Sequence, residues 1–414
     1  MYSRFTTQNA CSALADRRLL KARPAGLLPA IIIALIGLSL LLSAFIPAHA
    51  NVRTKAKIAL IMDYETGQIL FERDGQRPMA PASMSKLMTI AILFDMIQSG
   101  ELSLDTKFSV SEAAWRRGQG TGESKMWVLV GDEIALRDLL RGIIIQSGND
   151  ASQVVAENIA GSEEEFAKLM NSKAAAWGLT QSSFANATGM PDPNQKMSAR
   201  DLALLTRKII HDYPGLYPIF SEPEFTWSNI TQPNRNPLLK SFDGADGMKT
   251  GHTEESGYGL VGTAFRDGQR RIIVLNGLET AQARSREATR LMEQAFDLFD
   301  HRVFFTAGSR VGEADVFMGR TDKIGLVVNS EIGFLTARTA LEQASGEIVY
   351  QGPLRAPIDK GEQVAVLRIS MPGREAVEFP LYAEETVREV GFFAKIGFGL
   401  RSLLTPPDDG EVAG

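Results

Sequence analysis

Residues 81–89 read Pro-Ala-Ser-Met-Ser-Lys-Leu-Met-Thr and contain an S-x-x-K tetrad formed by Ser83 and Lys86. A mainly apolar stretch follows, so we predict a helix from about Ser83 to Gln98 that Gly100 ends. Positions i and i+3 share one face of a helix, which brings the Lys86 amine within reach of the Ser83 hydroxyl. A serine is a poor nucleophile until a base takes its proton, and a buried, neutral lysine can take it. We therefore expect Ser83 to be a nucleophile and Lys86 its general base.

The helix start also bears on the reaction that Ser83 would begin. The partial positive charge of a helix N-terminus disfavours protonated Lys86, and the backbone N–H of Ser83 is placed to donate to an oxyanion. The competing interpretation makes Ser83 a simple helix cap and Lys86 a surface residue. Other motifs along the chain argue against it.

A second motif, Ser147-Gly148-Asn149, follows the apolar helical segment 136–145. An S-x-N triplet by itself is a weak signal. We expect Ser147 to relay a proton and Asn149 to clamp a substrate amide. The alternative for Asn149 is an ordinary loop residue, since asparagine is common in turns.

A third motif, Lys249-Thr250-Gly251, is followed by His252. Lys249 offers a cation and Thr250 a hydroxyl, which suits an anionic ligand end such as a terminal carboxylate. Gly251 lacks a side chain, so we expect a substrate backbone to lie against this strand edge. The three motifs in this order, with helix, loop and strand contexts, are together a strong signal for acyl transfer by a serine.

The rest of residues 51–304 favours an α+β domain. Apolar runs at 57–63 and 69–71 predict paired strands, and two runs around Asp267-Gly268-Gln269 predict a hairpin. Ser162 and Ser198 stand where helix caps are expected. A further helix is predicted over about Ser285 to Asp300. Helices combined with an antiparallel hairpin sheet indicate the α+β class.

The composition changes after His301, and short alternating runs separated by Gly and Pro predict a small all-β domain over 305–385. These runs cover residues 323–328, 347–350, 363–369 and 376–381. The remaining divisions are a leader at 1–50, a helix at 386–404 and a tail at 405–414.

The chain resembles the low-molecular-mass penicillin-binding proteins of the D-alanyl-D-alanine carboxypeptidase type. Besides the three motifs, the resemblance rests on residues 184–189, 197–201 and 246–253. It covers Ile58 to about Leu404. It implies a penicillin-binding, β-lactamase-like transpeptidase domain, then a β-rich domain and a C-terminal membrane-binding helix.

The resemblance also implies roles for further residues. The backbone N–H of His252 would complete the oxyanion hole. Arg235 would lie near the carboxylate pocket, and Arg284 is a weaker match to a second family arginine. Ser147 would pass a proton to the leaving D-alanine amine. The implied substrate is a peptidoglycan pentapeptide, the implied inhibitors are β-lactams, and no cofactor or metal is required.

Other enzyme classes fit less well. The segment after residue 50 has three histidines and no G-x-S-x-G or H-E-x-x-H sequence, which disfavours Ser-His-Asp hydrolases and metalloproteases. The only cysteine is Cys11, so thiol chemistry needs a residue inside the leader. A serine β-lactamase, a DD-endopeptidase and a scaffold that has lost turnover are the remaining alternatives.

The first 50 residues are typical of a secretory signal peptide. They carry a net charge of +4, against −5 for all 414 residues, and the apolar run 31–42 precedes Ala48-His49-Ala50. We expect cleavage after Ala50, with an uncleaved signal anchor as the alternative. The location would then be periplasmic. The acidic remainder gives no indication of nucleic-acid binding.

The segment 386–404 has apolar residues at helical spacing, with Arg388, Lys395 and Arg401 among them. It is too short and too charged to span a bilayer, so we expect an interfacial helix on the inner-membrane surface. The alternative is a terminal helix docked on the protein.

Overall fold

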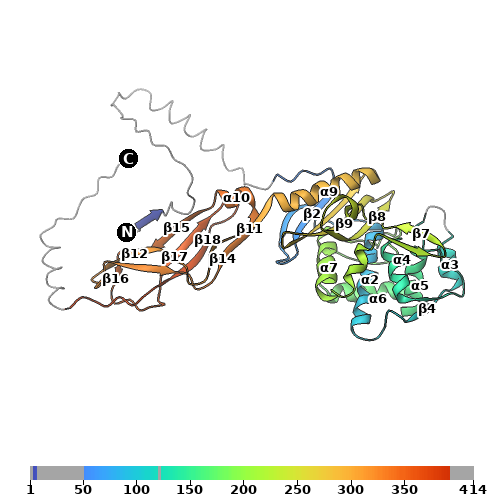
Figure 1. The fold of residues 1–414 in the computed structure, drawn as a ribbon, viewed down its shortest axis with the longest axis horizontal. Coiled ribbons are helices and arrows are strands. Elements are labelled where there is room, and N and C mark those ends of the chain that lie inside the picture. Colours follow the sequence, from blue (N-terminus) through green and yellow to red (C-terminus); the bar gives the residue numbers. More distant parts are fainter. Residues whose placement is uncertain (1–2, 7–50, 120–122, 392–414) are drawn as a thin grey trace, which may run out of the picture. The chain divides into compact units, whose positions relative to one another are not determined.

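The structure is a computed structural model that describes residues 3–6, 51–119 and 123–391 (Figure 1). The chain forms two compact units. One comprises Asn51–Phe299, and the other comprises the described residues from Asp300 onward together with Ser3–Thr6.

A five-stranded antiparallel sheet organises the first unit, in the order β3-β2-β10-β9-β8. The strands are β2 (Ile58–Asp63), β3 (Ile69–Arg73), β8 (Ala245–Thr253), β9 (Gly257–Arg266) and β10 (Gln269–Leu278). The predicted hairpin is confirmed: Asp267 and Gly268 both have positive φ, at 53° and 76°, as a tight hairpin turn requires. β8, which carries the third motif, is an edge strand.

Helices pack on both sides of this sheet (Figure 1). Helix α9 (Ala281–Asp297) contacts β9 and β10, and α7 (Ala199–Asp212) contacts β2 and β10. The short helix α8 (Leu238–Ser241) contacts β8 and α9. The remaining elements lie on the side of α7. They are α2 (Lys86–Gln98), α3 (Glu112–Arg117), α4 (Leu136–Ile144), α5 (Asn149–Ala160), α6 (Glu163–Ala176) and the short pairs β4 (Lys107–Ser109) with β5 (Glu133–Ala135) and β6 (Glu224–Trp227) with β7 (Ile230–Pro233).

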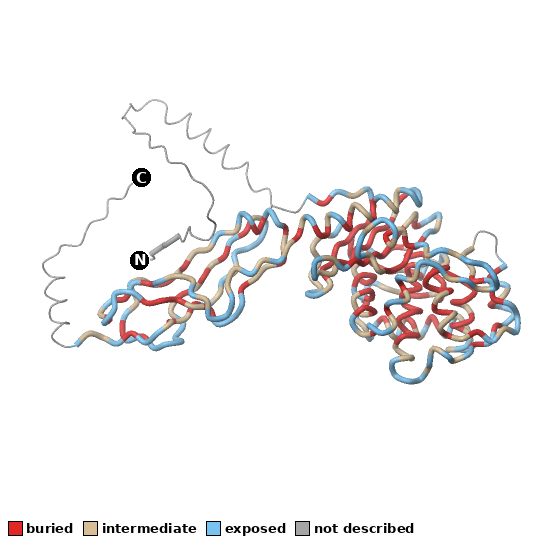
Figure 2. Tube along the Cα trace, in the orientation of Figure 1, coloured by how far each residue is buried: buried red, intermediate tan, exposed pale blue. Residues whose placement is uncertain are grey.

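Helix α2 is the centre of this unit. All of its residues from Lys86 to Phe94 are buried, so the helix has no solvent-facing side over this stretch (Figure 2). A helix that is apolar on every side belongs in a core. Lys86 is the one charged residue of this stretch, and it occupies the first position of the buried helix.

The predicted caps are present, and one predicted helix is displaced. The hydroxyls of Ser162 and Ser198 accept backbone N–H bonds three residues on, at 3.1 and 3.0 Å. Helix α9 begins at Ala281, before the predicted start at Ser285, because Thr280 caps it through the N–H of Ala283 at 3.0 Å. It ends at Asp297 because the chain enters the strand β11 (Phe299–Phe305).

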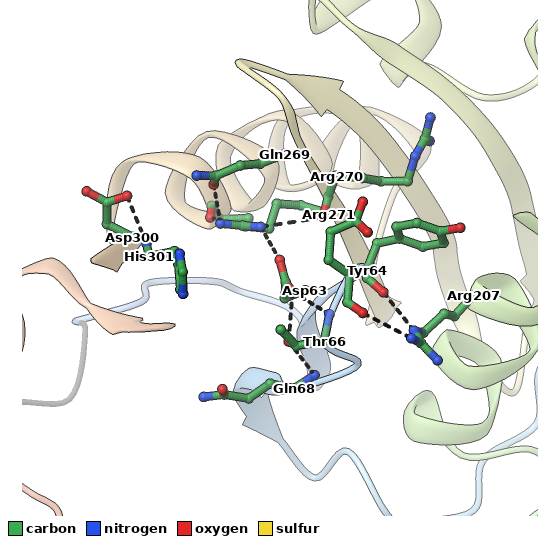
Figure 3. A network of polar contacts seen from close by, with 12 residues as sticks. Asp63, Tyr64, Thr66, Gln68, Arg207, Gln269, Arg270, Arg271, Asp300 and His301 are labelled. Atoms are coloured by element: carbon green, nitrogen blue, oxygen red, sulfur yellow. Dashed lines mark hydrogen bonds and ion pairs between the residues drawn. The ribbon is translucent and has the colours of Figure 1, made fainter. Parts of the chain in front are cut away.

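A buried ion pair joins β2 to β10 at the sheet end remote from the third motif (Figure 3). The Arg271 guanidinium donates to the Asp63 carboxylate, and both side chains are almost completely buried. Thr66 donates to the other Asp63 oxygen through its N–H at 2.8 Å and its hydroxyl at 2.7 Å. The pair therefore fixes the β2–β3 turn to the neighbouring strand, and removal of one partner would leave an uncompensated buried charge.

The second unit is built mainly from strands, as predicted. Its large sheet has the order β1-β15-β17-β18-β13-β12-β16, and β11 pairs with β14. The elements are β1 (Ser3–Thr6), β11 (Phe299–Phe305), β12 (Arg310–Phe317), β13 (Lys323–Val327), β14 (Ile332–Ala337), α10 (Arg338–Glu342), β15 (Ser345–Tyr350), β16 (Leu354–Arg355), β17 (Gln363–Ser370) and β18 (Val377–Ala383). Inward residues of β13, β15, β17 and β18 make its own hydrophobic core, including Leu326, Ile348, Leu367 and Leu381.

The predicted helix 386–404 does not begin at 386. Val387 exchanges backbone hydrogen bonds with Ile358 at 2.9 and 3.0 Å and is buried in the core of the second unit, and Glu389 bridges Gly319. These residues are held as extended chain by the β-rich unit, so the start of the predicted helix is corrected. Residues 392–404 lie outside the described residues.

The predicted leader also lies outside the described residues, apart from Ser3–Thr6, which form β1 and pair with β15. Among the helices that the structure describes, none has the length and apolar character needed to cross a bilayer.

Candidate active site

Ser83 lies in a 3₁₀ turn, Ala82–Ser85, immediately before α2. Ala82 has a positive φ of 48°, and the Ser85 hydroxyl donates to the Ala82 carbonyl at 3.0 Å. Ser83 is half-buried, whereas Pro81, Ala82, Met84 and Ser85 around it are buried. The turn therefore presents one serine at an accessible position and buries its neighbours.

Two glycines allow other segments to approach this turn. A Cβ on Gly251 would lie 2.8 Å from the Pro81 carbonyl oxygen, and one on Gly189 would lie 2.1 Å from the Ala82 carbonyl oxygen. The sequence suggested that Gly251 makes room for a substrate. In the structure, the space beside its Cα is filled by the turn that carries Ser83.

The Lys86 amine contacts three oxygen atoms. Nζ lies 2.9 Å from the Ser83 hydroxyl and 2.7 Å from Asn149 Oδ1, and it also donates to the Thr188 carbonyl. The side chain is fully buried. Burial lowers the Lys86 pKa to about 7, and the positive charges of Arg235 and Arg117 add to the effect. A lysine in this state can accept the proton of a neighbouring hydroxyl near neutral pH.

A second buried lysine lies close to the second motif. Lys249 Nζ is 2.9 Å from the Ser147 hydroxyl, and Ser147 has a left-handed backbone with φ of 60°. Burial holds the Lys249 pKa well below its usual range, and the charges of Lys86, Arg235 and Arg284 act in the same direction. The site therefore combines two lysine–serine pairs, and it carries an excess of positive charge that favours an anionic ligand.

The structure brings the other predicted residues to the same region. Thr250 is buried in β8, and His252 is exposed at its end, stacked on Tyr258 at 3.8 Å between ring centroids. Arg235 donates to the Ser124 hydroxyl. Arg284 on α9 lies over the Tyr258 ring at 5.5 Å.

Asn149 is the first residue of α5 and not a free loop residue. Its Oδ1 accepts from Lys86, while Nδ2 donates to Glu123 Oε2 at 3.0 Å and lies 3.6 Å from Met190 Sδ. The amide thus already has partners at both ends. A substrate carbonyl that binds Nδ2 must displace or share one of them.

Sequence reasoning missed several residues of the site. Thr188 contributes a backbone carbonyl, which leaves no side-chain signal, although residues 184–189 were part of the resemblance. Asp150 is fully buried and accepts the N–H groups of Met126 and Trp127 at 2.8 and 2.9 Å. Its position directly after the S-x-N triplet was the only available indication. Glu123 lies outside the three motifs and outside the segments that carry the resemblance.

Metal binding finds no support in the part of the chain that the structure describes. No group of three or more His, Cys, Asp or Glu side chains there could hold a metal ion. The groups that meet at the site are serine hydroxyls, lysine amines and the Asn149 amide.

A profile of the D-alanyl-D-alanine carboxypeptidase family matches residues 45–280, which is more than half of the chain. The chain belongs to this family. A profile described as the C-terminal domain of penicillin-binding protein 5 matches residues 299–389. The predicted resemblance, the α+β fold with its β-rich second part and the serine-peptidase class are thereby confirmed.

Individual relatives agree with this assignment. D-alanyl-D-alanine carboxypeptidase DacC of Escherichia coli is 34% identical over 345 residues, which cover 82% of this chain and 86% of the relative. The crystal structure of D-alanyl-D-alanine carboxypeptidase DacD from Francisella tularensis matches with a TM-score of 0.67 at 30% identity, covering 83% of this chain and 96% of that one. Penicillin-binding protein D2 of Listeria monocytogenes, solved in an ampicillin-bound form, matches with a TM-score of 0.54 at 30% identity, covering 60% and 99%.

Proposed function

We propose that this chain is a serine-type carboxypeptidase that removes the terminal D-alanine of peptidoglycan pentapeptides through an acyl-enzyme on Ser83. The observation that carries the proposal is the 2.9 Å contact between Ser83 Oγ and the fully buried amine of Lys86. A lysine with a pKa of about 7 supplies the base that the serine requires.

Acylation begins when Lys86 takes the Ser83 proton and Oγ attacks the carbonyl carbon of the penultimate D-alanine. The C–N bond then breaks, and the leaving amine of the terminal D-alanine needs a proton. Ser147 donates that proton and recovers one from Lys249, which lies 2.9 Å away. The backbone N–H groups of Ser83 and His252 stabilise the oxyanion.

Deacylation releases the shortened peptide. Water attacks the ester carbonyl and passes its proton through Ser147 to Lys249, which lost one during acylation. The bond to Ser83 Oγ then breaks, and the proton held by Lys86 returns to the serine. The departure of D-alanine opens the space that the water enters. A β-lactam leaving group stays tethered to the acyl-enzyme, which makes benzylpenicillin a slowly released inhibitor in this proposal.

The terminal carboxylate of the substrate binds near Lys249, Thr250 and Arg235. Burial and neighbouring cations disfavour the charged form of Lys249 in the free site. An incoming carboxylate supplies the missing negative charge and favours the protonated amine. Binding of the substrate carboxylate therefore favours protonation of Lys249, and the protonated amine supplies the proton that Ser147 recovers.

A DD-endopeptidase or a serine β-lactamase of the same fold is the alternative function. Both share the acylation chemistry, and the family membership favours the carboxypeptidase. Peptidoglycan lies outside the cytoplasmic membrane. We therefore assign the enzyme to the periplasm, with export through the leader at 1–50 and peripheral attachment to the membrane through the segment after residue 391.

The test uses the mature chain and the peptide diacetyl-L-lysyl-D-alanyl-D-alanine. Released D-alanine is expected with the wild type and not with Ser83→Ala. A wild type that degrades benzylpenicillin catalytically and releases no D-alanine would move the assignment to a β-lactamase.

A further inference from the structure

A short segment, residues 123–128, lies along the start of α5 and is fixed to it through the main chain. The N–H of Asn149 donates to the Ser124 carbonyl at 2.8 Å. In return, the buried Asp150 carboxylate accepts the N–H groups of Met126 and Trp127. The position of this segment relative to the S-x-N motif is therefore set by hydrogen bonds of its main-chain groups, two of which go to the Asp150 side chain.

The same segment is held from its other side. Gln232 Nε2 on β7 donates to the Lys125 carbonyl at 3.0 Å, and the Arg235 guanidinium donates to the Ser124 hydroxyl. Trp127 adopts a left-handed backbone with φ of 72°, an uncommon conformation for a bulky residue. These constraints place Glu123, the first residue of the segment, at a defined point beside the catalytic groups.

The Glu123 carboxylate lies at the end of a short chain of hydrogen bonds that starts at the nucleophile. Ser83 Oγ contacts Lys86 Nζ at 2.9 Å, Lys86 contacts Asn149 Oδ1 at 2.7 Å, and Asn149 Nδ2 contacts Glu123 at 3.0 Å. Within residues 51–119 and 123–391, no Lys or Arg nitrogen approaches this carboxylate within 4 Å, although other carboxylates of this unit, such as Asp95 and Glu222, pair with one. A half-buried carboxylate at the site thus has an amide partner and no cationic one.

The direction of the substrate follows from the proposed reaction, on which this inference rests. Ser83 attacks the carbonyl of the penultimate residue, and the terminal carboxylate points toward Lys249. The residue upstream of the penultimate D-alanine must then extend the other way, past Asn149. When its carbonyl takes the Asn149 amide, Glu123 loses its hydrogen-bond partner and faces the side chain of that upstream residue.

We propose that Glu123 determines substrate specificity by pairing with a free ammonium group on the side chain of the third residue of the donor peptide. Among pentapeptides, the preferred substrates are therefore those whose third residue keeps an unmodified side-chain amine. The competing role for Glu123 is only to orient the Asn149 amide. These roles are separable, because loss of orientation lowers turnover of every peptide, whereas loss of an ion pair affects only peptides that carry the amine.

The experiment compares α-acetyl-L-lysyl-D-alanyl-D-alanine, which has a free ε-amine, with the diacetyl peptide, which lacks it. We expect kcat/KM of the wild type to be about fivefold higher for the free amine, in line with a partly exposed ion pair, and the preference to shrink at high salt. Glu123→Gln keeps an oxygen for Asn149 and removes the charge, so the ratio should fall to about 1. Glu164→Gln, which removes a charge from an exposed position of α6, should keep the wild-type ratio.

Equal rates for the two peptides in the wild type, or an unchanged ratio in Glu123→Gln, would overturn the inference. Glu123→Ser serves as a second charge-removing variant where the glutamine variant does not fold. Failure of the proposed function looks different, since neither peptide then releases D-alanine. In that case the slowing of benzylpenicillin acylation by each peptide measures the same preference without turnover.

Discussion

Gly251 of β8 and Pro81 before the serine turn approach so closely that a Cβ on the glycine would lie 2.8 Å from the Pro81 carbonyl oxygen. Real Cβ atoms do not come this near to a backbone oxygen. The K-T-G glycine therefore fixes the distance between the edge strand and the turn that carries Ser83. Lys249 lies two residues before Gly251 and so shares its face of the strand, which ties the position of the second lysine to the same contact.

Gly251→Ala should separate β8 from the serine turn. We expect kcat/KM for the diacetyl peptide to fall by about tenfold or more, because sub-ångström to ångström displacements of catalytic groups are costly. Gly215→Ala is the matched control, since its φ is not positive and no atom lies within 4 Å of an added Cβ. Full activity in Gly251→Ala would show that the strand and the turn adjust independently.

The pH dependence of acylation should report Lys86. Its pKa is lowered from the ordinary 10.5 to about 7, so the amine is mainly protonated below that pH and mainly neutral above it. The second-order rate constant for acylation by benzylpenicillin should therefore rise with pH through about 7 and then level off. Stopped-flow measurement of the acylation rate between about pH 5 and about pH 9 checks this prediction, because that range extends to both sides of the pKa of about 7.

Lys86→Ala should reduce acylation by about 100-fold or more across that range, since the general base is lost. Lys173→Ala is a suitable control, because this lysine pairs with Asp95 away from the serine turn. If the residual acylation rate of Lys86→Ala still rose with pH through about 7 as in the wild type, the titrating group would be a residue other than Lys86.

The local part of the site was predictable from sequence, and the contacts between segments were not. The i, i+3 spacing of Ser83 and Lys86 is a property of a helix start, and the Asp267-Gly268 hairpin is a property of its turn, so both were found. Thr188 contributes a backbone carbonyl, and Glu123 reaches the site because Asp150 fixes a segment more than twenty residues earlier in the chain. The predicted helix start at 386 was wrong because Val387 packs into the second unit, which helical periodicity cannot reveal.

Asp150→Ala should destabilise the first unit and disturb the active site together. The carboxylate is fully buried and accepts N–H groups from Met126, Trp127 and Ala151. Removing it leaves buried donors without partners, and we expect a loss of about 3 kcal/mol in the free energy of unfolding. Urea denaturation measures this. Asp132→Ala, which removes a more exposed carboxylate that accepts one N–H from Leu129, should cost much less.

Benzylpenicillin should leave a persistent adduct on Ser83. In class A β-lactamases, rapid hydrolysis of the adduct uses a glutamate that activates water on the acyl-enzyme. Residues 175–190 contain no Asp or Glu, and Glu163 accepts the N–H of Ala187 at 3.2 Å, on the backbone of that loop. Intact-protein mass spectrometry over time measures the adduct, with Ser83→Ala as the control. Glu163→Gln should leave the lifetime of the adduct unchanged, and a prolonged lifetime would instead make Glu163 a deacylating group.

Two truncations that differ by six residues separate membrane binding from the stability of the second unit. A chain that ends at Gly391 keeps Val387, whose backbone pairs with Ile358 and whose side chain is buried in the second unit. A chain that ends at Glu385 loses that pairing and leaves the Ile358 N–H and carbonyl without their partners, so its second unit should unfold at a lower urea concentration.

Both chains should lose binding to vesicles that contain anionic lipid, because the basic and apolar segment after residue 391 is absent from both. Cosedimentation with such vesicles measures binding, and the full mature chain is the positive control. The chain that ends at Gly391 should also retain wild-type release of D-alanine from the diacetyl peptide, since the proposed catalytic residues belong to Asn51–Phe299. Vesicle binding by that chain equal to the binding of the full mature chain would place the membrane contact elsewhere on the protein.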